Sequence, residues 1–426
     1  MNTRRAIACA TIAFIFAGCA STARLAPEGS VGPDSWLMYQ ERPDHNAVIT
    51  GVAGAHMWTY RAGSRINSGL AIVRNSIIFD TFGGQVVSLN ATTGEVRWIA
   101  HADNIIMSTP VVDQGIVVVG TGRNGTLGQP PGSLVYDPSH NSDPNEIWGR
   151  AEGDHIIALD EATGSTLWRY RTLGEDMPSP VITNGLLIFA NGDQHLYALH
   201  LRSGKPLWKD DLDGVSTMAS ANFAMNLVFA SACDLSRGTD ETLAVRPKGG
   251  VVWWRIPGGS CDSAPTIGAG KVFLSGVVTS HKGAWGRGIV EAVHLVSGEP
   301  LWRYSADSDG PFSRRGSNER AIAGVWADAA YFQSFPTIGE VVALRGSDGA
   351  LLWKLHTAAA VKMSPVVAGG RIYFGDILGN FYIVNAATGK LLQTRRYDEG
   401  FSVAPPVIVG KTAYLVTTRT VRAVAI

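Results

Sequence analysis

Arginine, tryptophan and histidine side chains gather in four insertions that interrupt an otherwise regular sequence, namely 121–153, 234–241, 279–288 and 307–321. Arginine and tryptophan are enriched at binding hot spots, so this set favours a protein partner or an anionic ligand. No nucleophile, base or catalytic group is assigned. The predicted binding residues are Arg123, Trp148, Arg150, His281, Trp285, Arg287, Arg314, Arg315 and Arg320.

These charges fit a second interpretation equally well. A solvated rim would carry the same arginines, with part of their charge neutralised by Asp307, Asp309 and Glu319. No cysteine and histidine spacing is typical of a zinc site. The sequence therefore predicts a binding surface or a solvated rim, and no metal centre.

Two cysteines fall within the regular region. Cys233 ends the second predicted strand of one unit, and Cys261 precedes the first strand of the next unit. An oxidising compartment would allow them to form a disulfide if they lie close enough. We favour the disulfide, and two free thiols remain the alternative.

The elements that must position these residues follow a Gly-x-x-x-Trp repeat. Its tryptophans recur at steps of 40, 70, 40, 46, 48 and 51 residues, which indicates a unit of 40 with insertions and hence a repeat architecture. The seventh copy has Gln393 in the aromatic position. The predicted blade-docking tryptophans are Trp58, Trp98, Trp168, Trp208, Trp254, Trp302 and Trp353.

Each unit has the pattern of a four-stranded meander. In the third unit, short apolar runs at 177–182, 186–190, 195–199 and 205–208 are separated by turn residues such as Asn184-Gly185. A meander with two apolar faces must stack on its neighbours, and radial stacking gives a β-propeller. In this arrangement glycine provides the positive φ of the turn between the third and fourth strands, and tryptophan fills the space between blades.

Seven full units are followed by a partial eighth with three strands, at 402–409, 412–417 and 421–426. The segment 56–60 has the pattern of a fourth strand without a blade of its own. We therefore predict an all-β, eight-bladed propeller of four-stranded antiparallel blades, closed by this N-terminal strand. In such a ring all four insertions emerge on one face, here called the elaborated face, which we expect to be the binding side.

The N-terminus has the layout of a secretory signal: Arg4 and Arg5, an apolar run from Ala6 to Phe16, and small residues before Cys19. Phe16-Ala17-Gly18-Cys19 resembles the bacterial lipobox, which implies lipidation of Cys19 and an outer-membrane anchor facing the periplasm. A cysteine near an ordinary cleavage site is the alternative. The expected organisation is a signal peptide at 1–18, a tether and N-terminal extension at 19–55, and the propeller at 56–426.

The segments Ala158 to Trp168 (ALDEATGSTLW) and Ala198 to Trp208 (ALHLRSGKPLW) resemble the docking motif of the PQQ-like propeller repeat. Within that superfamily the chain is most similar to BamB-type outer-membrane assembly lipoproteins. The resemblance implies a non-catalytic scaffold without a cofactor. Its partners would be a BamA-like subunit of the barrel-assembly machinery and unfolded outer-membrane proteins.

A PQQ-dependent quinoprotein dehydrogenase is the main alternative, because it shares the eight-bladed repeat. The sequence lacks the adjacent cysteines typical of those enzymes. Asn124, Glu146 and Asp154 could ligate the calcium ion in principle, but acids in loops are more often just solvated. A third alternative is an envelope propeller that binds a small ligand, which would require a defined pocket at the axis of the elaborated face.

Overall composition narrows the partner class further. The chain has 426 residues, 36 basic and 36 acidic side chains, and no net charge. A nucleic-acid surface requires an excess of positive charge to attract phosphates. Nucleic acid is therefore not an expected partner.

Overall fold

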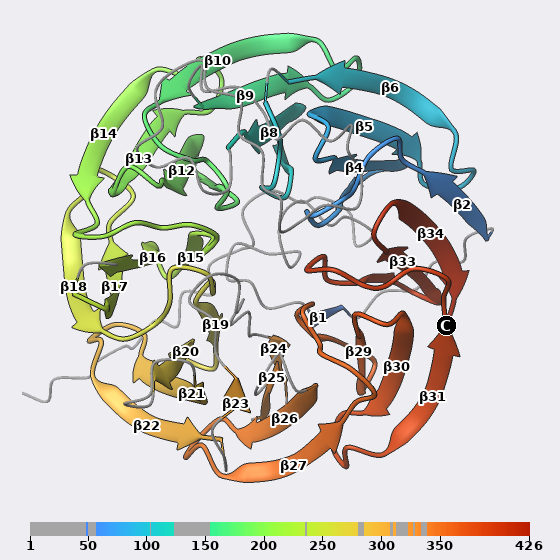
Figure 1. Ribbon diagram of the computed structural model, residues 1–426. Helices are drawn as coiled ribbons and strands as arrows, with labels where there is room; N and C mark the ends of the chain where they lie inside the picture. Colours follow the sequence, from blue (N-terminus) through green and yellow to red (C-terminus); the bar gives the residue numbers. More distant parts are fainter. Residues whose placement is uncertain are drawn as a thin grey trace, which may run out of the picture. The chain divides into compact units, whose positions relative to one another are not determined.

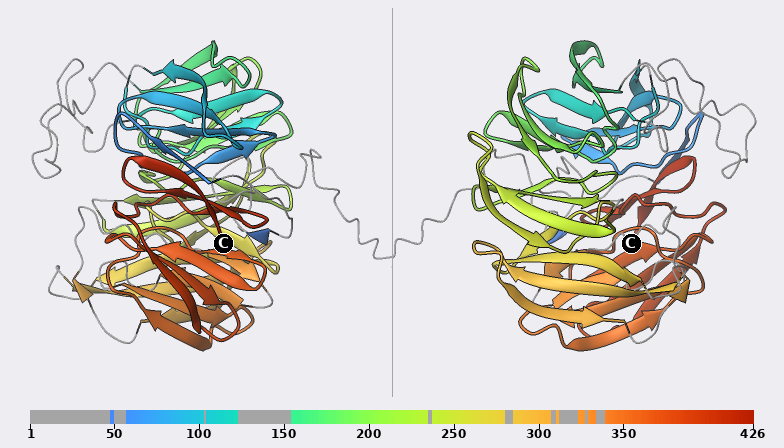
Figure 2. Two further views of the ribbon diagram at one scale, coloured as in Figure 1. Left: turned by 90° about the vertical axis from the view of Figure 1, so that its right-hand side faces the viewer. Right: turned by 60° about the vertical axis from the view of Figure 1, so that its left-hand side comes forward.

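In the computed structural model the described residues are 48–49, 57–102, 104–122, 154–234, 237–279, 285–306, 310–311, 323–326, 329–333 and 339–426. They form strands and turns without a helix. The strands build eight separate sheets, each with a core of four antiparallel strands, arranged as the blades of a propeller (Figures 1 and 2). The predicted eight-bladed all-β propeller is confirmed.

The first four blades run in chain order, each from its inner to its outer strand. Blade 1 is β3 (Ala71–Val73), β4 (Ser76–Asp80), β5 (Gln85–Asn90) and β6 (Val96–His101). Blade 2 is β7 (Val111–Asp113), β8 (Ile116–Gly120), β9 (Asp154–Asp160) and β10 (Thr166–Thr172). Blade 3 is β11 (Val181–Thr183), β12 (Leu186–Ala190), β13 (His195–His200) and β14 (Pro206–Asp211). Blade 4 is β15 (Asn222–Ala224), β16 (Leu227–Asp234), β17 (Thr239–Val245) and β18 (Val252–Pro257).

The remaining blades follow the same order, and the last is completed from the N-terminal side. Blade 5 is β19 (Thr266–Gly268), β20 (Lys271–Thr279), β21 (Trp285–His294) and β22 (Pro300–Ser305), with β23 (Gly310–Pro311) beside β21. Blade 6 is β24 (Ala323–Trp326), β25 (Ala329–Gln333), β26 (Glu340–Arg345) and β27 (Leu351–His356). Blade 7 is β28 (Val366–Ala368), β29 (Arg371–Gly375), β30 (Asn380–Asn385) and β31 (Leu391–Arg396). Blade 8 is β32 (Val407–Val409), β33 (Thr412–Val416) and β34 (Thr420–Ala425), with β2 (Trp58–Arg61) as its outer strand.

The ring is closed by pairing between the two ends of the propeller. Strand β2 pairs antiparallel with β34, with Trp58 opposite Ala423 and Arg61 opposite Thr420. The predicted role of the N-terminal strand as the clasp is confirmed. Strand β1 (Val48–Ile49), which lies within the predicted tether, pairs parallel with the inner strand β28 of blade 7.

The repeat tryptophans join each blade to the next. Each of the seven indole Nε1 atoms donates a hydrogen bond of 2.7 to 3.1 Å to a backbone carbonyl of the following blade, for example Trp168 to Leu201 and Trp353 to Ala386. The indole ring packs on the repeat glycine of that blade. At Gly204, where φ is +65°, a Cβ atom would lie 2.6 Å from the ring of Trp168. The glycine therefore provides both the turn conformation and the space for the neighbouring indole.

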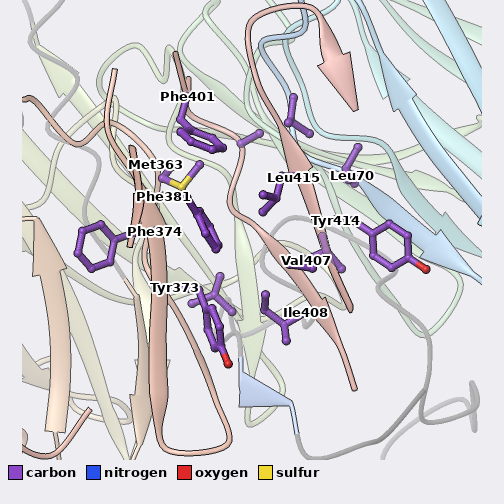
Figure 3. Packing of buried hydrophobic residues seen from close by; sticks show 14 of the residues in the cluster. Leu70, Met363, Tyr373, Phe374, Phe381, Phe401, Val407, Ile408, Tyr414 and Leu415 are labelled. Carbon is purple, nitrogen blue, oxygen red and sulfur yellow. The ribbon is translucent and has the colours of Figure 1, made fainter. Parts of the chain in front are cut away.

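Apolar residues of adjacent sheets interdigitate between the blades. The largest buried cluster spans blades 6, 7, 8 and 1, and includes Phe374, Phe381, Phe401 and Leu415 (Figure 3). Strands β29 and β33 are buried on both faces, except for the first residue of β29. This packing makes the repeat region one continuous ring of blades.

Two sequence predictions need correction in their boundaries. The first strand of the third unit begins at Val181 and not at Met177, and that of the eighth begins at Val407 and not at Ser402. Prolines explain both differences, because Pro180 and Pro405 lack the N–H that a strand needs for pairing. The residues before these prolines approach the propeller axis instead.

Candidate functional site

The elaborated face is built partly from strand extensions. The insertions at 234–241 and 279–288 were predicted as connections, but Thr239–Glu241 belongs to β17 and Trp285–Gly288 belongs to β21. Extra backbone pairs such as Val278 with Arg287 continue the hairpin of blade 5. Long antiparallel hairpins satisfy their own backbone groups, so added residues extend an existing strand pair.

Most of the predicted binding residues lie outside the described part of the chain. These are Arg123, Trp148, Arg150, His281, Arg314, Arg315 and Arg320, together with the predicted lipidation site Cys19. Trp285 and Arg287 lie at the start of β21, and the Arg287 side chain is exposed. The assembly of the nine residues into one surface stays a prediction.

Cys233 and Cys261 form a disulfide, with their Cα atoms 5.1 Å apart. The bond links the second strand of blade 4 to the segment that enters blade 5. The carbonyl of Cys261 also accepts hydrogen bonds from the backbone N–H groups of Thr217, Met218 and Ala219. Covalent and backbone bonds therefore fix the segments that approach the axis from blades 4 and 5.

A chain of hydroxyl groups surrounds part of the axis. The N–H of Gly69 donates to Thr109 Oγ1 at 2.8 Å, the N–H of Thr109 to Ser179 Oγ at 2.8 Å, and the N–H of Ser179 to Ser220 Oγ at 2.9 Å. Each residue directly precedes the inner region of its blade, so the bonds link blades 1 to 4 in order. They satisfy N–H groups that would otherwise face the axis unpaired.

Beside these hydroxyls lies a small axial cavity of about 30 Å³. Met107, Met177 and Met218 line it from blades 2, 3 and 4, each two residues before the hydroxyl of its blade. Asn67 and Asp262 occupy the equivalent positions in blades 1 and 5. The described wall thus contains equivalent residues of blades 1 to 5, three of them thioethers, together with Val403 of blade 8.

Asp262 is the carboxylate of this cavity wall. It accepts a hydrogen bond from the Thr217 hydroxyl, and its own N–H donates to Ser260 Oγ at 3.1 Å. Burial, reinforced by the charge of Asp262, raises the pKa of the nearby Asp240 from 3.8 to about 6. Two carboxyl groups therefore share the environment of the disulfide, because Asp240 is also the register partner of Cys233.

Sequence reasoning missed this axial group. Its signal is a short motif before the inner strands: Met107-Ser-Thr-Pro110, Met177-Pro-Ser-Pro180 and Met218-Ala-Ser-Ala221. The motif was missed because Met177 was predicted as the first apolar residue of a strand. Proline at the fourth position in two copies marks where the strand begins.

The described wall of the cavity does not fit pyrroloquinoline quinone. Pockets for ligands of this kind have volumes of roughly 300 Å³ or more, whereas this cavity has about 30 Å³. Its described lining contains no lysine or arginine to pair with the carboxylates of the quinone. Within the described residues, no three His, Cys, Asp or Glu side chains are placed to hold a metal ion together.

The outer rim presents a different kind of surface. The outer strand of every blade is the last strand of its sheet, so one edge has no strand partner among the described residues. Six of these strands carry an exposed apolar side chain directly before the docking position, with 41% to 51% of its surface accessible. These residues, here called the rim residues, are Leu167, Leu207, Trp253, Leu301, Leu352 and Leu392. None of the described residues forms a helix long and apolar enough to cross a membrane.

Eight four-stranded blades, with a tryptophan packed on a repeat glycine at seven of the eight joints, define a propeller of the PQQ-like repeat class. The family profile described as "Outer membrane protein assembly factor BamB" matches residues 45–221 and 226–426, and the chain belongs to this family.

Individual relatives have different named functions. Tetrathionate hydrolase of Acidithiobacillus ferrooxidans is 25% identical over 443 residues, which cover 92% of this chain and 86% of that protein. Outer membrane protein assembly factor BamB of Burkholderia pseudomallei is 21% identical over 426 residues, covering 96% and 94%. The crystal structure of quinohemoprotein alcohol dehydrogenase from Comamonas testosteroni has a TM-score of 0.66 at 11% identity, covering 93% of this chain and 81% of that one. At this identity the structural likeness shows the shared fold alone.

Proposed function

We propose that this protein is a non-catalytic scaffold of the bacterial envelope that supports assembly and insertion of β-barrel proteins into the outer membrane. Its partners would be a BamA-like subunit and unfolded barrel proteins. Cys19 would carry the lipid anchor and hold the propeller on the periplasmic side. The arginines and tryptophans of the elaborated face would bind the machinery subunit.

The observation that carries this proposal is the rim. An exposed strand edge with apolar side chains is a template for pairing with another extended chain. The segments that form the strands of a barrel have apolar residues at alternating positions. Before the barrel has folded, such a segment could pair with the edge through its backbone and contact the rim residues through its apolar side chains. Leu207 on β14 and Leu301 on β22 are half exposed beside free edges of this kind.

Site-specific crosslinking tests the rim directly. A photo-crosslinking amino acid at Leu207 or Leu301 should capture an unfolded outer-membrane protein, whereas the same group at Asn184, in a short turn of blade 3, should not. Envelope extracts should also yield a BamA-like subunit with the wild-type protein. Equal capture at all three positions, or none at the rim, would refute the proposed role of the rim.

A second candidate is hydrolysis of a small sulfur compound at the axis, as the name of the tetrathionate hydrolases suggests. The axial cavity containing Asp262 is the observation that favours it, because a carboxylate can accept a proton from attacking water. It ranks second because tetrathionate is an anion and the described lining offers it no positive charge.

An activity assay separates the two candidates. Tetrathionate consumption by purified protein that is lost in Asp262→Asn and kept in Asp211→Asn, whose carboxylate is exposed on β14, would establish the second candidate. Absence of consumption across the acidic and neutral pH range would exclude it and leave the scaffold proposal untouched.

A further inference from the structure

Three methionine side chains converge at the propeller axis from three different blades. Met107 and Met177 belong to one buried cluster, and Met218 packs against it. All three line the same axial cavity. The chain contains only eight methionines, so the meeting of three thioethers at one cavity is a distinctive chemical feature.

The repeat architecture explains how the three side chains meet. Each methionine stands two residues before Thr109, Ser179 or Ser220, whose hydroxyl groups accept the hydrogen bonds that link blades 1 to 4. Those bonds fix the backbone segments from which the methionines extend. The methionines thus lie in the connections that lead into the inner strands, and these connections are tied to one another by the hydroxyl hydrogen bonds.

The chemistry of the cavity favours a soft cation. Thioether sulfur is a soft ligand that selects Cu(I) over hard cations such as Mg²⁺ and Ca²⁺. The described lining adds one carboxylate, Asp262. A volume of about 30 Å³ accommodates a single ion.

We propose that the axial cavity is a binding site for one Cu(I) ion, held by the thioether sulfurs of Met107, Met177 and Met218. Binding joins blades 2, 3 and 4 at the axis, and no bond is broken or electron transferred. The site is independent of the rim and of the proposed scaffold role.

Competition with a Cu(I) chelator measures the affinity and stoichiometry of Cu(I) binding at this site. The full chain, carrying Cys9→Ser and Cys19→Ser so that free thiols do not compete, is titrated without oxygen against a chromophoric Cu(I) chelator. We expect one equivalent of Cu(I) per chain and sulfur ligation in X-ray absorption spectra. Ag(I), a redox-inert soft ion, should bind with the same stoichiometry by calorimetry.

Leucine variants identify the ligands, because replacing methionine by leucine preserves volume and usually leaves the fold intact. Each of Met107→Leu, Met177→Leu and Met218→Leu should weaken Cu(I) binding at least tenfold, and the triple variant should lose it. Met225→Leu, in an exposed turn of blade 4, is the matched control and should bind as the parent does. Circular dichroism and thermal unfolding verify the fold of each variant.

Two results would overturn the proposal. One is the absence of stoichiometric Cu(I) or Ag(I) binding by the folded parent. The other is a triple leucine variant that folds normally and still binds Cu(I) with parental affinity.

Discussion

Seven of the eight joints between blades use tryptophan, and the eighth does not. In the joint between blades 2 and 3, Trp168 lies on Gly204 and donates a hydrogen bond of 2.8 Å to the carbonyl of Leu201. In the joint between blades 7 and 8, the equivalent residue is the exposed Gln393. There, Arg395 donates a hydrogen bond to the carbonyl of Ala425.

The difference follows from the way blade 8 is made. In every other blade, a glycine turn connects the third and fourth strands and receives the tryptophan of the preceding blade. In blade 8 these strands are β34 and β2, which are not consecutive in the chain, so no such turn exists. A tryptophan at position 393 would have no glycine to pack on. The aromatic residue is therefore required by the receiving turn, and not by the outer strand that carries it.

The largest expected effect comes from removing an indole. Trp168→Ala should lower the free energy of unfolding by about 3–5 kcal/mol, because it leaves a cavity and an unpaired carbonyl. Gln393→Ala should cost less than about 0.5 kcal/mol, as expected for an exposed residue. Urea unfolding of both variants measures the contrast. Equal losses of unfolding free energy would show that Gln393 contributes as much to its joint as Trp168 does.

The joint between blades 4 and 5 carries a covalent bond in addition to Trp254. Replacing Cys233 and Cys261 by serine should cost about 3.5 kcal/mol, as expected for a bridge that spans 28 residues. Urea unfolding of this variant, with and without a reductant, checks the value. If reductant destabilises the serine variant as much as the parent, the disulfide is not the source of the effect.

Two glycines distinguish the effect of the positive φ on stability from the effect of the contact with the indole. Gly204→Ala should cost about 2–4 kcal/mol, because it combines an unfavourable positive φ with a clash against Trp168. Gly185→Ala has a similar φ of +74° but open space around it, so it should cost only about 1–2 kcal/mol. Thermal unfolding of the two variants measures the difference. If both lose the same stability, backbone strain alone explains the repeat glycine.

The smallest expected effect is the pH dependence of stability near the disulfide that joins blades 4 and 5. Because burial and Asp262 raise the folded-state pKa of Asp240 from 3.8 to about 6, ionisation of Asp240 destabilises the fold. Stability from this group is fully present below about pH 4, and it is lost as the pH rises through 6. Asp240→Asn should therefore be more stable than the parent by about 1–2 kcal/mol at pH 7.5 and equal to it at pH 4.

Unfolding at both pH values checks this prediction, with Asp211→Asn as the control for an exposed carboxylate. A gain that is the same at pH 4 and pH 7.5 would exclude ionisation as its cause.

The fold was predictable because the repeat residues act locally and recur. Gly-x-x-x-Trp encodes a turn and a joint in one motif, and the isolated strand at Trp58 predicted the closure. The axial site was not predictable in the same way. Met107, Met177 and Met218 are far apart in the sequence and meet only because the ring places equivalent positions around one axis. Their spacing matches the repeat, so nothing in the sequence distinguishes them from ordinary core residues.

The clasp also has a consequence for biosynthesis. Arg61 on β2 forms an ion pair of 2.6 Å with Glu399, and these residues are 338 positions apart. The first strand of the propeller to leave the ribosome is thus among the last to find its partner. Until β34 has been made, β2 has no strand of its blade to pair with. Ring closure therefore waits for the C-terminal end of the chain, whatever the order in which the other blades form.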